Sequence, residues 1–218
     1  GGPPRSVDYM DRVPVERWTE AQIGAVSPAR GGPLVLVQLR DLTPIARLCN
    51  YVNLLVVNAN SPYRTLADLL AAARATPGAL TYGSAGISSS NHLSGELLAM
   101  KAGVSMTHVP YRGSALAMNE LLAGGLQFMF DAPNTSTPLL RAGRLRALGT
   151  TGRERHPKFP DLPTIAETVP GYEFSGWMGI MAPAGLPRML QARLTAEVEK
   201  SQAAPDTGDR LAALGLDV

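Results

Sequence analysis

Three short stretches of this 218-residue chain combine small residues with side chains that could bind an anion. The first, residues 83–92, reads "GSAGISSSNH" and ends on His92. Small residues let a ligand approach the backbone closely, and successive N–H groups at a helix start attract negative charge. The serine hydroxyls can donate to a carboxylate, and they belong to Ser84, Ser88, Ser89 and Ser90. Taken alone, the stretch equally fits a turn and helix cap.

The second stretch is "VPYRGSA", residues 109–115. Pro110 and Gly113 shape a turn, and Tyr111 offers a hydroxyl. Arg112 could bind a carboxylate with two parallel hydrogen bonds, or it could simply be solvated. Ser114 is expected to cap the helix that follows.

The third stretch, "MFDAPNT", places Asp131 at the end of a strand-like run. This carboxylate could receive an ammonium or hydroxyl group, or it could cap the turn before Pro133. A single histidine in a first helical turn, such as His92, has a structural interpretation as well. His108 and His156 are assigned no functional role.

Ser84, His92 and Asp131 together invite a serine hydrolase, which is kept as the alternative function. A nucleophile elbow requires G-x-S-x-G, but Tyr82 stands where the first glycine belongs. A phosphate loop requires a lysine, and none follows until Lys101. The dinucleotide motif and helical metal-ligand spacings are absent as well. We therefore predict a protein that is not an enzyme and has no cofactor or metal.

Composition narrows the possible partners. The formal net charge is +2 and aromatic residues make up 6%, which argues against nucleic-acid binding. No apolar run approaches the roughly 20 residues that span a bilayer, so no direct membrane insertion is expected. Cys49 is the single cysteine, which excludes an internal disulfide.

Hydrophobic periodicity predicts alternating strands and helices from residue 53 onward. Strands are expected at 53–59, 79–84, 104–111, 126–131, 145–151 and 176–187, with an earlier one at 33–39. Helices are expected after Thr65 and at 91–101, 115–125, 138–143, 189–202 and 206–214, with one helical turn within 156–172. This alternation is typical of an α/β fold with largely parallel strands, whose ligands lie at the carboxyl ends of strands.

Several helix details follow from the same patterns. Thr65 and Asp68 form an expected capping box, and Leu66, Leu69, Leu70 and Ala73 share one apolar face. In the next helix the aligned apolar residues are Leu93, Leu97 and Met100. Thr137 and Pro138 are expected to begin the short helix at 138–143.

Two long segments carry a family resemblance. The first is "LTYGSAGISSSNHLSGELLAMKAGVSMTHVPYRGSALAMNELLAGGLQFMFD", and the second, later in the chain, is "GRLRALGTTGRERHPKFPDLPTIAETVPGYEFSGWMGIMAPAGLP". Together they resemble the Bug-type periplasmic solute-binding proteins of tripartite tricarboxylate transporters. The resemblance covers about residues 41–218. Fewer residues precede the matching part than this family normally carries, so the first lobe is expected to be incomplete.

The resemblance implies a type II periplasmic-binding-protein fold, with two lobes of mixed, mostly parallel sheets around a cleft. Residues 1–52 would belong to the first lobe, residues 53–175 would form the second lobe with the ligand loops, and residues 176–218 would cross back to the first. The cleft would hold a small carboxylate: a dicarboxylate, tricarboxylate, acidic amino acid or aromatic acid. By position, the implied ligand-binding residues are Ser84, Gly86, Ser89, Ser90, His92, Tyr111, Arg112, Gly113, Ser114 and Asp131.

The implied partners are the carboxylate and the membrane subunits of the transporter. The implied location is the periplasm, after removal of a signal peptide that this chain does not show. A monomer is expected. A truncated homologue that no longer binds a ligand is the other alternative.

Overall fold

The computed structural model describes residues 42–213 and Leu216, so the predicted strand at 33–39 lies outside the described residues. The described residues fall into two compact units. One contains residues 42–50 and 177–213, and the other contains residues 51–176. The assignment of these segments to two lobes stays a prediction.

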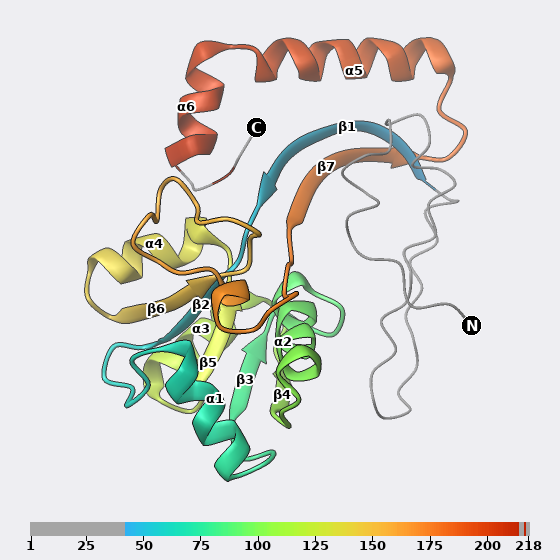
Figure 1. The fold of residues 1–218 in the computed structure, drawn as a ribbon. Coiled ribbons are helices and arrows are strands. Elements are labelled where there is room, and N and C mark those ends of the chain that lie inside the picture. The colour runs from blue at the N-terminus through green and yellow to red at the C-terminus, as the bar shows by residue number, and fades with distance from the viewer. Residues whose placement is uncertain (1–41, 214–215, 217–218) are drawn as a thin grey trace. The chain divides into compact units, whose positions relative to one another are not determined.

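The larger unit is built on a five-stranded sheet in the order β4-β3-β5-β2-β6 (Figure 1). Strand β3 pairs in parallel with β4 and β5, while β2 runs antiparallel to β5 and β6. The strands are β2 (Leu54–Asn58), β3 (Thr81–Ser84), β4 (Thr107–Pro110), β5 (Phe128–Asp131) and β6 (Leu145–Thr150). The predicted α/β class with a mixed sheet is confirmed, although two of the four pairings in this sheet are parallel and two are antiparallel.

Helices cover both faces of this sheet, because successive strand side chains point to opposite faces. Phe128 and Phe130 of β5 pack with helices α1 (Leu66–Ala75) and α2 (Ser90–Ala102). Met129 packs with α3 (Ser114–Ala123) and α4 (Pro133–Arg141). The strand ends are therefore fixed between two apolar layers.

Helix α1 follows the sequence prediction closely. Thr65 and Asp68 form the capping box, and each accepts a hydrogen bond from the other's backbone N–H. The four residues of the predicted apolar face, Leu66, Leu69, Leu70 and Ala73, are buried. The single helical turn predicted within 156–172 is a 3-10 turn at Ile165–Glu167.

Helix α2 buries the predicted apolar face only in part. Its buried residues are Asn91, Ser94, Gly95 and Leu98, whereas Met100 is 61% exposed. Leu93 and Leu97 of the predicted face are partly buried and pack against the core, so the prediction was wrong for Met100 alone. The fully buried positions include small residues, which allow the helix to lie close to the sheet. Gly95 lies directly on the ring of Tyr82.

The starts of the next two helices also differ from the predictions. Gly113, and not Ser114, is the N-cap of α3, and no side chain caps that end. Helix α4 begins at Pro133, five residues before the predicted Pro138, which lies inside the helix. Pro133 and Pro138 both suit a first helical position, and the buried hydroxyl of Ser136 bonded to Asp131 favours the earlier start.

The smaller unit contains strands β1 (Leu42–Tyr51) and β7 (Gly176–Pro183) with helices α5 (Arg188–Gln202) and α6 (Pro205–Ala213). Strand β1 was not predicted, because its partner β7 is distant in sequence and no local alternation marks it. Side chains of α5 donate to the backbone of β1, from Gln191 to Pro44 and from Thr195 to Ile45. None of the helices in the described part of the chain has the length and apolar character needed to cross a membrane.

Replacing Gly95 by alanine tests the close contact between α2 and the sheet. An added Cβ would lie 2.3 Å from Cε2 of Tyr82, whose hydroxyl is held by a 2.7 Å hydrogen bond to Glu96. Overpacking of this kind costs about 1–3 kcal/mol, so we expect G95A to lower the free energy of unfolding measured by urea titration. The control is G208A in α6, where a Cβ meets no atom within 4 Å and alanine should be neutral or stabilising. Equal effects of the two substitutions would contradict this interpretation.

Candidate functional site

The three predicted stretches meet at one edge of the sheet. Strands β4, β3 and β5 are neighbours and parallel, with Ser84 beside Pro110 and Gly83 beside Met129. Their carboxyl ends therefore open on the same side, as ligand sites in α/β folds require. Each of these ends leads into the N-terminus of a helix, α2, α3 or α4 (Figure 1).

Hydrogen bonds join the loops to one another. The backbone N–H groups of Tyr111 and Gly113 donate to the carbonyls of Ser84 and Ala85, at 3.0 and 3.2 Å. The buried side-chain amide of Asn91, at the start of α2, donates to the carbonyl of Phe130 in β5 at 2.6 Å. The three loops thus form one connected structure, called here the loop cluster (residues 84–92, 110–114 and 131–136).

The first loop uses several of its predicted ligand groups to hold its own shape. Ser84 is fully buried, and its hydroxyl contacts both the N–H and the carbonyl of Gly86. The hydroxyl of Ser89 donates to the same carbonyl at 2.7 Å and caps α2. Gly86 has a φ of 135°, which favours glycine. A ligand role for these three residues stays a prediction.

His92 supports the same loop from the first turn of α2. Its Nδ1 accepts a hydrogen bond from the N–H of Ser88 at 3.1 Å. Ser88 has a φ of 66°, and among the described residues it is the one residue other than glycine with a positive φ. Burial lowers the pKa of His92, and the carboxylate of Glu96 opposes that shift. His92 is therefore neutral at neutral pH and able to accept this bond.

His108, to which the sequence assigned no function, contacts the loop directly. It lies on β4, and its Nε2 is 2.6 Å from Oγ of Ser84. Its ring packs on that of His92, with 4.0 Å between the centroids. Burial and the neighbouring His92 lower the pKa of His108 to about 4. The signal that could have found it is the two-residue alternation of β4, which points His108 to the same face as the start of the loop.

The second loop keeps its polar groups available. Within the part of the chain that the structure describes, the side chains of Tyr111, Arg112 and Ser114 make no hydrogen bond, and neither does that of Ser90 in the first loop. Arg112 is exposed, and Gly113, which follows it and is the N-cap of α3, has a φ of 111°. The N-terminus of the ten-residue helix α3 has no side-chain cap. A guanidinium, hydroxyls and uncapped N–H groups are donors suited to a carboxylate.

Asp131 is committed to the start of α4. Its carboxylate is 1% exposed and accepts hydrogen bonds from the hydroxyls of Thr135 and Ser136. Burial raises the pKa of Asp131, and these hydroxyl bonds oppose that shift. The side chain therefore acts within the loop cluster as an anchor, and its predicted ligand role remains untested.

The geometry does not favour the serine hydrolase alternative. Among the described residues, His92 forms no hydrogen bond with Ser84 or Asp131. Ser84 does contact a histidine, His108, but its hydroxyl is fully buried and bonded to Gly86. In the same described segments, no group of three or more His, Cys, Asp or Glu side chains is arranged to hold a metal ion.

Replacing Ser136 by alanine tests the anchoring of Asp131. The change removes one of two side-chain donors to a buried carboxylate, which costs about 1–3 kcal/mol. We expect S136A to lower the free energy of unfolding by this amount in urea titrations. S114A is the matched control, since its hydroxyl makes no hydrogen bond within the described residues and its loss should cost less than about 0.5 kcal/mol. Similar losses for both variants would show that Asp131 does not depend on Ser136.

The lowered pKa of His108 predicts a pH effect on stability. The unfolded chain binds the proton of this histidine near its ordinary pKa of 6.5, whereas the folded chain binds it only near 4. Stability from this group is therefore lost as pH falls through that window. We expect the unfolding free energy of the wild type to fall relative to that of H108Q as the pH is lowered over this range, because glutamine does not titrate. A difference that does not change with pH would contradict the assignment.

Comparison with known proteins identifies the family. The model for the tripartite tricarboxylate transporter family receptor matches residues 21–218. A protein from Pseudomonas sp. strain P51, named for the tcbD-tcbE intergenic region, is 44% identical over 179 residues, covering 81% of this chain and 53% of its own length. The chain spans about half the length of the curated relatives it matches.

Solved structures give the same family. R. palustris Rpa4515 with adipate has a TM-score of 0.80 at 33% identity, covering 96% of this chain and 72% of its own. MatC from Rhodopseudomonas palustris with bound malate has a TM-score of 0.76 at 31% identity, covering 81% and 60%. The periplasmic binding protein BugD has the same TM-score at 29% identity and the same coverage. The chain belongs to the tripartite tricarboxylate transporter receptor family, the Bug-type solute-binding proteins.

Proposed function

We propose that this chain binds a small carboxylate at the loop cluster and serves as a receptor of a tripartite tricarboxylate transporter. The observation that carries the proposal is the set of uncommitted donors on the second loop. Arg112, the hydroxyl of Ser114 and the uncapped start of α3 follow one another there, beside a first loop whose shape is fixed internally. A bidentate guanidinium with backbone N–H groups matches the geometry of a carboxylate.

The relatives support this ligand class. One of the similar structures holds adipate and another holds malate, both dicarboxylates. They share the fold of this chain at about one third identity. A dicarboxylate is accordingly the first ligand to test, with tricarboxylates, acidic amino acids and aromatic acids after it.

The remaining parts of the proposal follow from the family. The receptor would lie in the periplasm, act as a monomer, deliver its ligand to the transporter's membrane subunits and catalyse no reaction on it. Residues 53–175 would form its second lobe. The carboxylate would accept hydrogen bonds from the donors of the second loop, Tyr111 included, and from Ser90 of the first loop.

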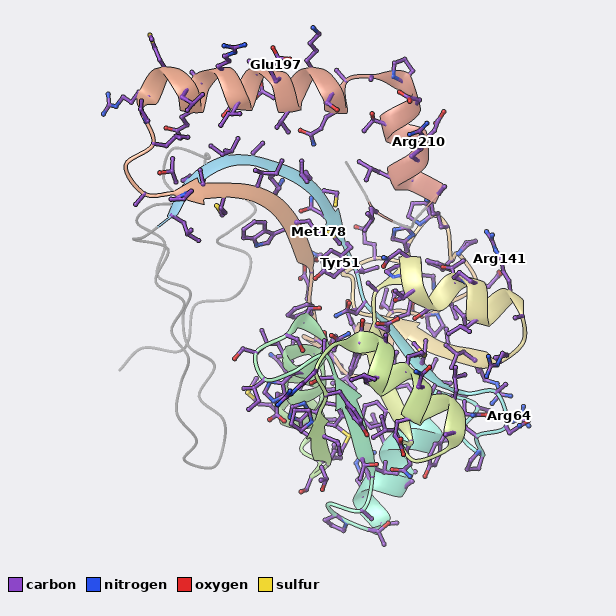
Figure 2. The ribbon with its side chains drawn as sticks, turned by 180° about the vertical axis from the view of Figure 1, so that it is seen from behind. Tyr51, Arg64, Arg141, Met178, Glu197 and Arg210 are labelled. Atoms are coloured by element: carbon purple, nitrogen blue, oxygen red, sulfur yellow. The ribbon has the colours of Figure 1, made fainter. Side chains whose placement is uncertain are left out.

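Replacing Arg112 by alanine tests the proposal. A hydrogen bond to a charged group contributes about 1.5–3 kcal/mol, so we expect R112A to weaken adipate or malate binding by about tenfold or more in isothermal titration calorimetry. The control is R141A, since Arg141 is an exposed cation in the last turn of α4 that projects outward (Figure 2). R141A changes the net charge equally and should leave affinity unchanged.

A neutral ligand provides the second control. Adipamide has the shape of adipate without its charge, and it should not bind if the donors recognise a carboxylate. Equal losses in R112A and R141A would indicate only a general charge effect. Failure of every carboxylate to bind the wild-type chain would overturn the proposal.

A further inference from the structure

The hydroxyl of Ser84 is the point from which the first loop is held. It has one proton to donate and contacts three groups: the N–H of Gly86 at 3.1 Å, the carbonyl of Gly86 at 3.0 Å and Nε2 of His108 at 2.6 Å. All three contacts are satisfied together in one arrangement. His108 donates from Nε2 to Ser84, Ser84 donates to the carbonyl of Gly86, and the N–H of Gly86 donates to Ser84.

His92 supports the loop at a second point, where it accepts a hydrogen bond and does not donate one. Its Nδ1 accepts from the N–H of Ser88, so its proton is on Nε2, 3.8 Å from Oε1 of Glu96. The two imidazoles therefore support the loop at Gly86 and at Ser88, two residues apart. Their rings are in contact, so neither can move without disturbing the other.

We propose that His108 and His92 are positioning residues of the carboxylate site, which hold the first loop in its binding shape only while both imidazoles are neutral. This inference rests on the function proposed above. Neither histidine needs to touch the ligand. They act through Ser84 and through the N–H of Ser88, which set the directions of the loop's remaining donors.

Acid should release this support. Protonation of His92 places a proton on Nδ1, so the ring can no longer accept from Ser88. Protonation of His108 adds a charge beside the ring of His92, and the two cations would repel each other. The titratable groups facing the pair are Tyr82, whose ring lies 5.0 Å from that of His108, and Glu96, which faces His92. Glu96 favours a charged His92, but it already accepts a hydrogen bond from Tyr82.

Two pairs of variants separate hydrogen bonding from simple packing. H108Q keeps a donor near the position of Nε2, and H92N keeps an acceptor near the position of Nδ1, but neither titrates. H108L and H92L keep bulk and lose the polar atom. H156N is the control, because the Nδ1 of His156 accepts from the N–H of Lys158, outside the loop cluster.

The first measurement needs no ligand. Amide hydrogen exchange of the full 218-residue chain, followed by NMR near neutral pH, should show Gly86 exchanging about tenfold faster in H108L and Ser88 about tenfold faster in H92L. H108Q, H92N and H156N should stay within about threefold of wild type. Unchanged exchange at Gly86 in H108L and at Ser88 in H92L would overturn the inference.

The second measurement is the affinity for adipate at several pH values. Adipate titrates as well, so the informative quantity is the wild-type affinity relative to that of H92N and of H108Q at each pH. This ratio should fall by about fivefold or more as acid protonates the histidines. The ratio of the wild-type affinity to that of H156N should not change with pH. A ratio independent of pH would overturn the inference.

These outcomes are distinguishable from failure of the proposed function. If neither adipate nor malate binds the wild type, the proposed function fails, and the exchange measurement alone decides whether the histidines hold the loop. If a leucine variant does not fold, amide exchange of the wild type, H108Q and H92N at several pH values still tests the inference. As the pH is lowered, the Gly86 and Ser88 amides should lose more protection in the wild type than in these two variants.

Discussion

The parallel pairing of β3 with both β4 and β5 is the constraint on which the rest of the larger unit depends. Parallel neighbours place their carboxyl ends at one edge, so loops that are far apart in the chain become neighbours in space. The side chains of the strands are fixed by apolar layers on both faces, with Phe128 and Phe130 on one face and Met129 on the other. The loop cluster therefore begins from rigid points.

Within the loop cluster, polar groups divide into those that build the loops and those that remain available. Ser84, Ser89, His92 and Asp131 have partners inside the protein, whereas Arg112 and Ser114 make no hydrogen bond in the described part of the chain. This division is physically reasonable, since a donor already used to hold a turn cannot also serve a ligand at full strength. Rigid loops with free donors lower the entropic cost of binding.

The positive charge of the loop cluster is confined to the second loop. The buried carboxylate of Asp131 is bonded to hydroxyls, and the two histidines are kept neutral by burial, so the exposed Arg112 and the start of α3 carry the positive character of the cluster. A site with one cation and oriented N–H groups attracts an anion without a surplus of fixed charge. The contacts of His108 with Ser84 and His92 also connect the first loop to the edge strand β4.

The amino-acid sequence by itself determined the alternation of strands and helices, the capping box at Thr65, the apolar face of α1 and the three polar stretches that follow strands. Each of these depends on residues close in sequence, where turn chemistry and periodicity act directly. Only the tertiary structure decided which face of α2 is buried, where α4 begins, that β1 is a strand, and that His108 holds Ser84. These depend on partners distant in the chain: Tyr82 against Gly95, β7 against β1, and β4 beside β3. Local patterns carry no information about such partners, because the pairing of strands is set by the packing of the whole unit.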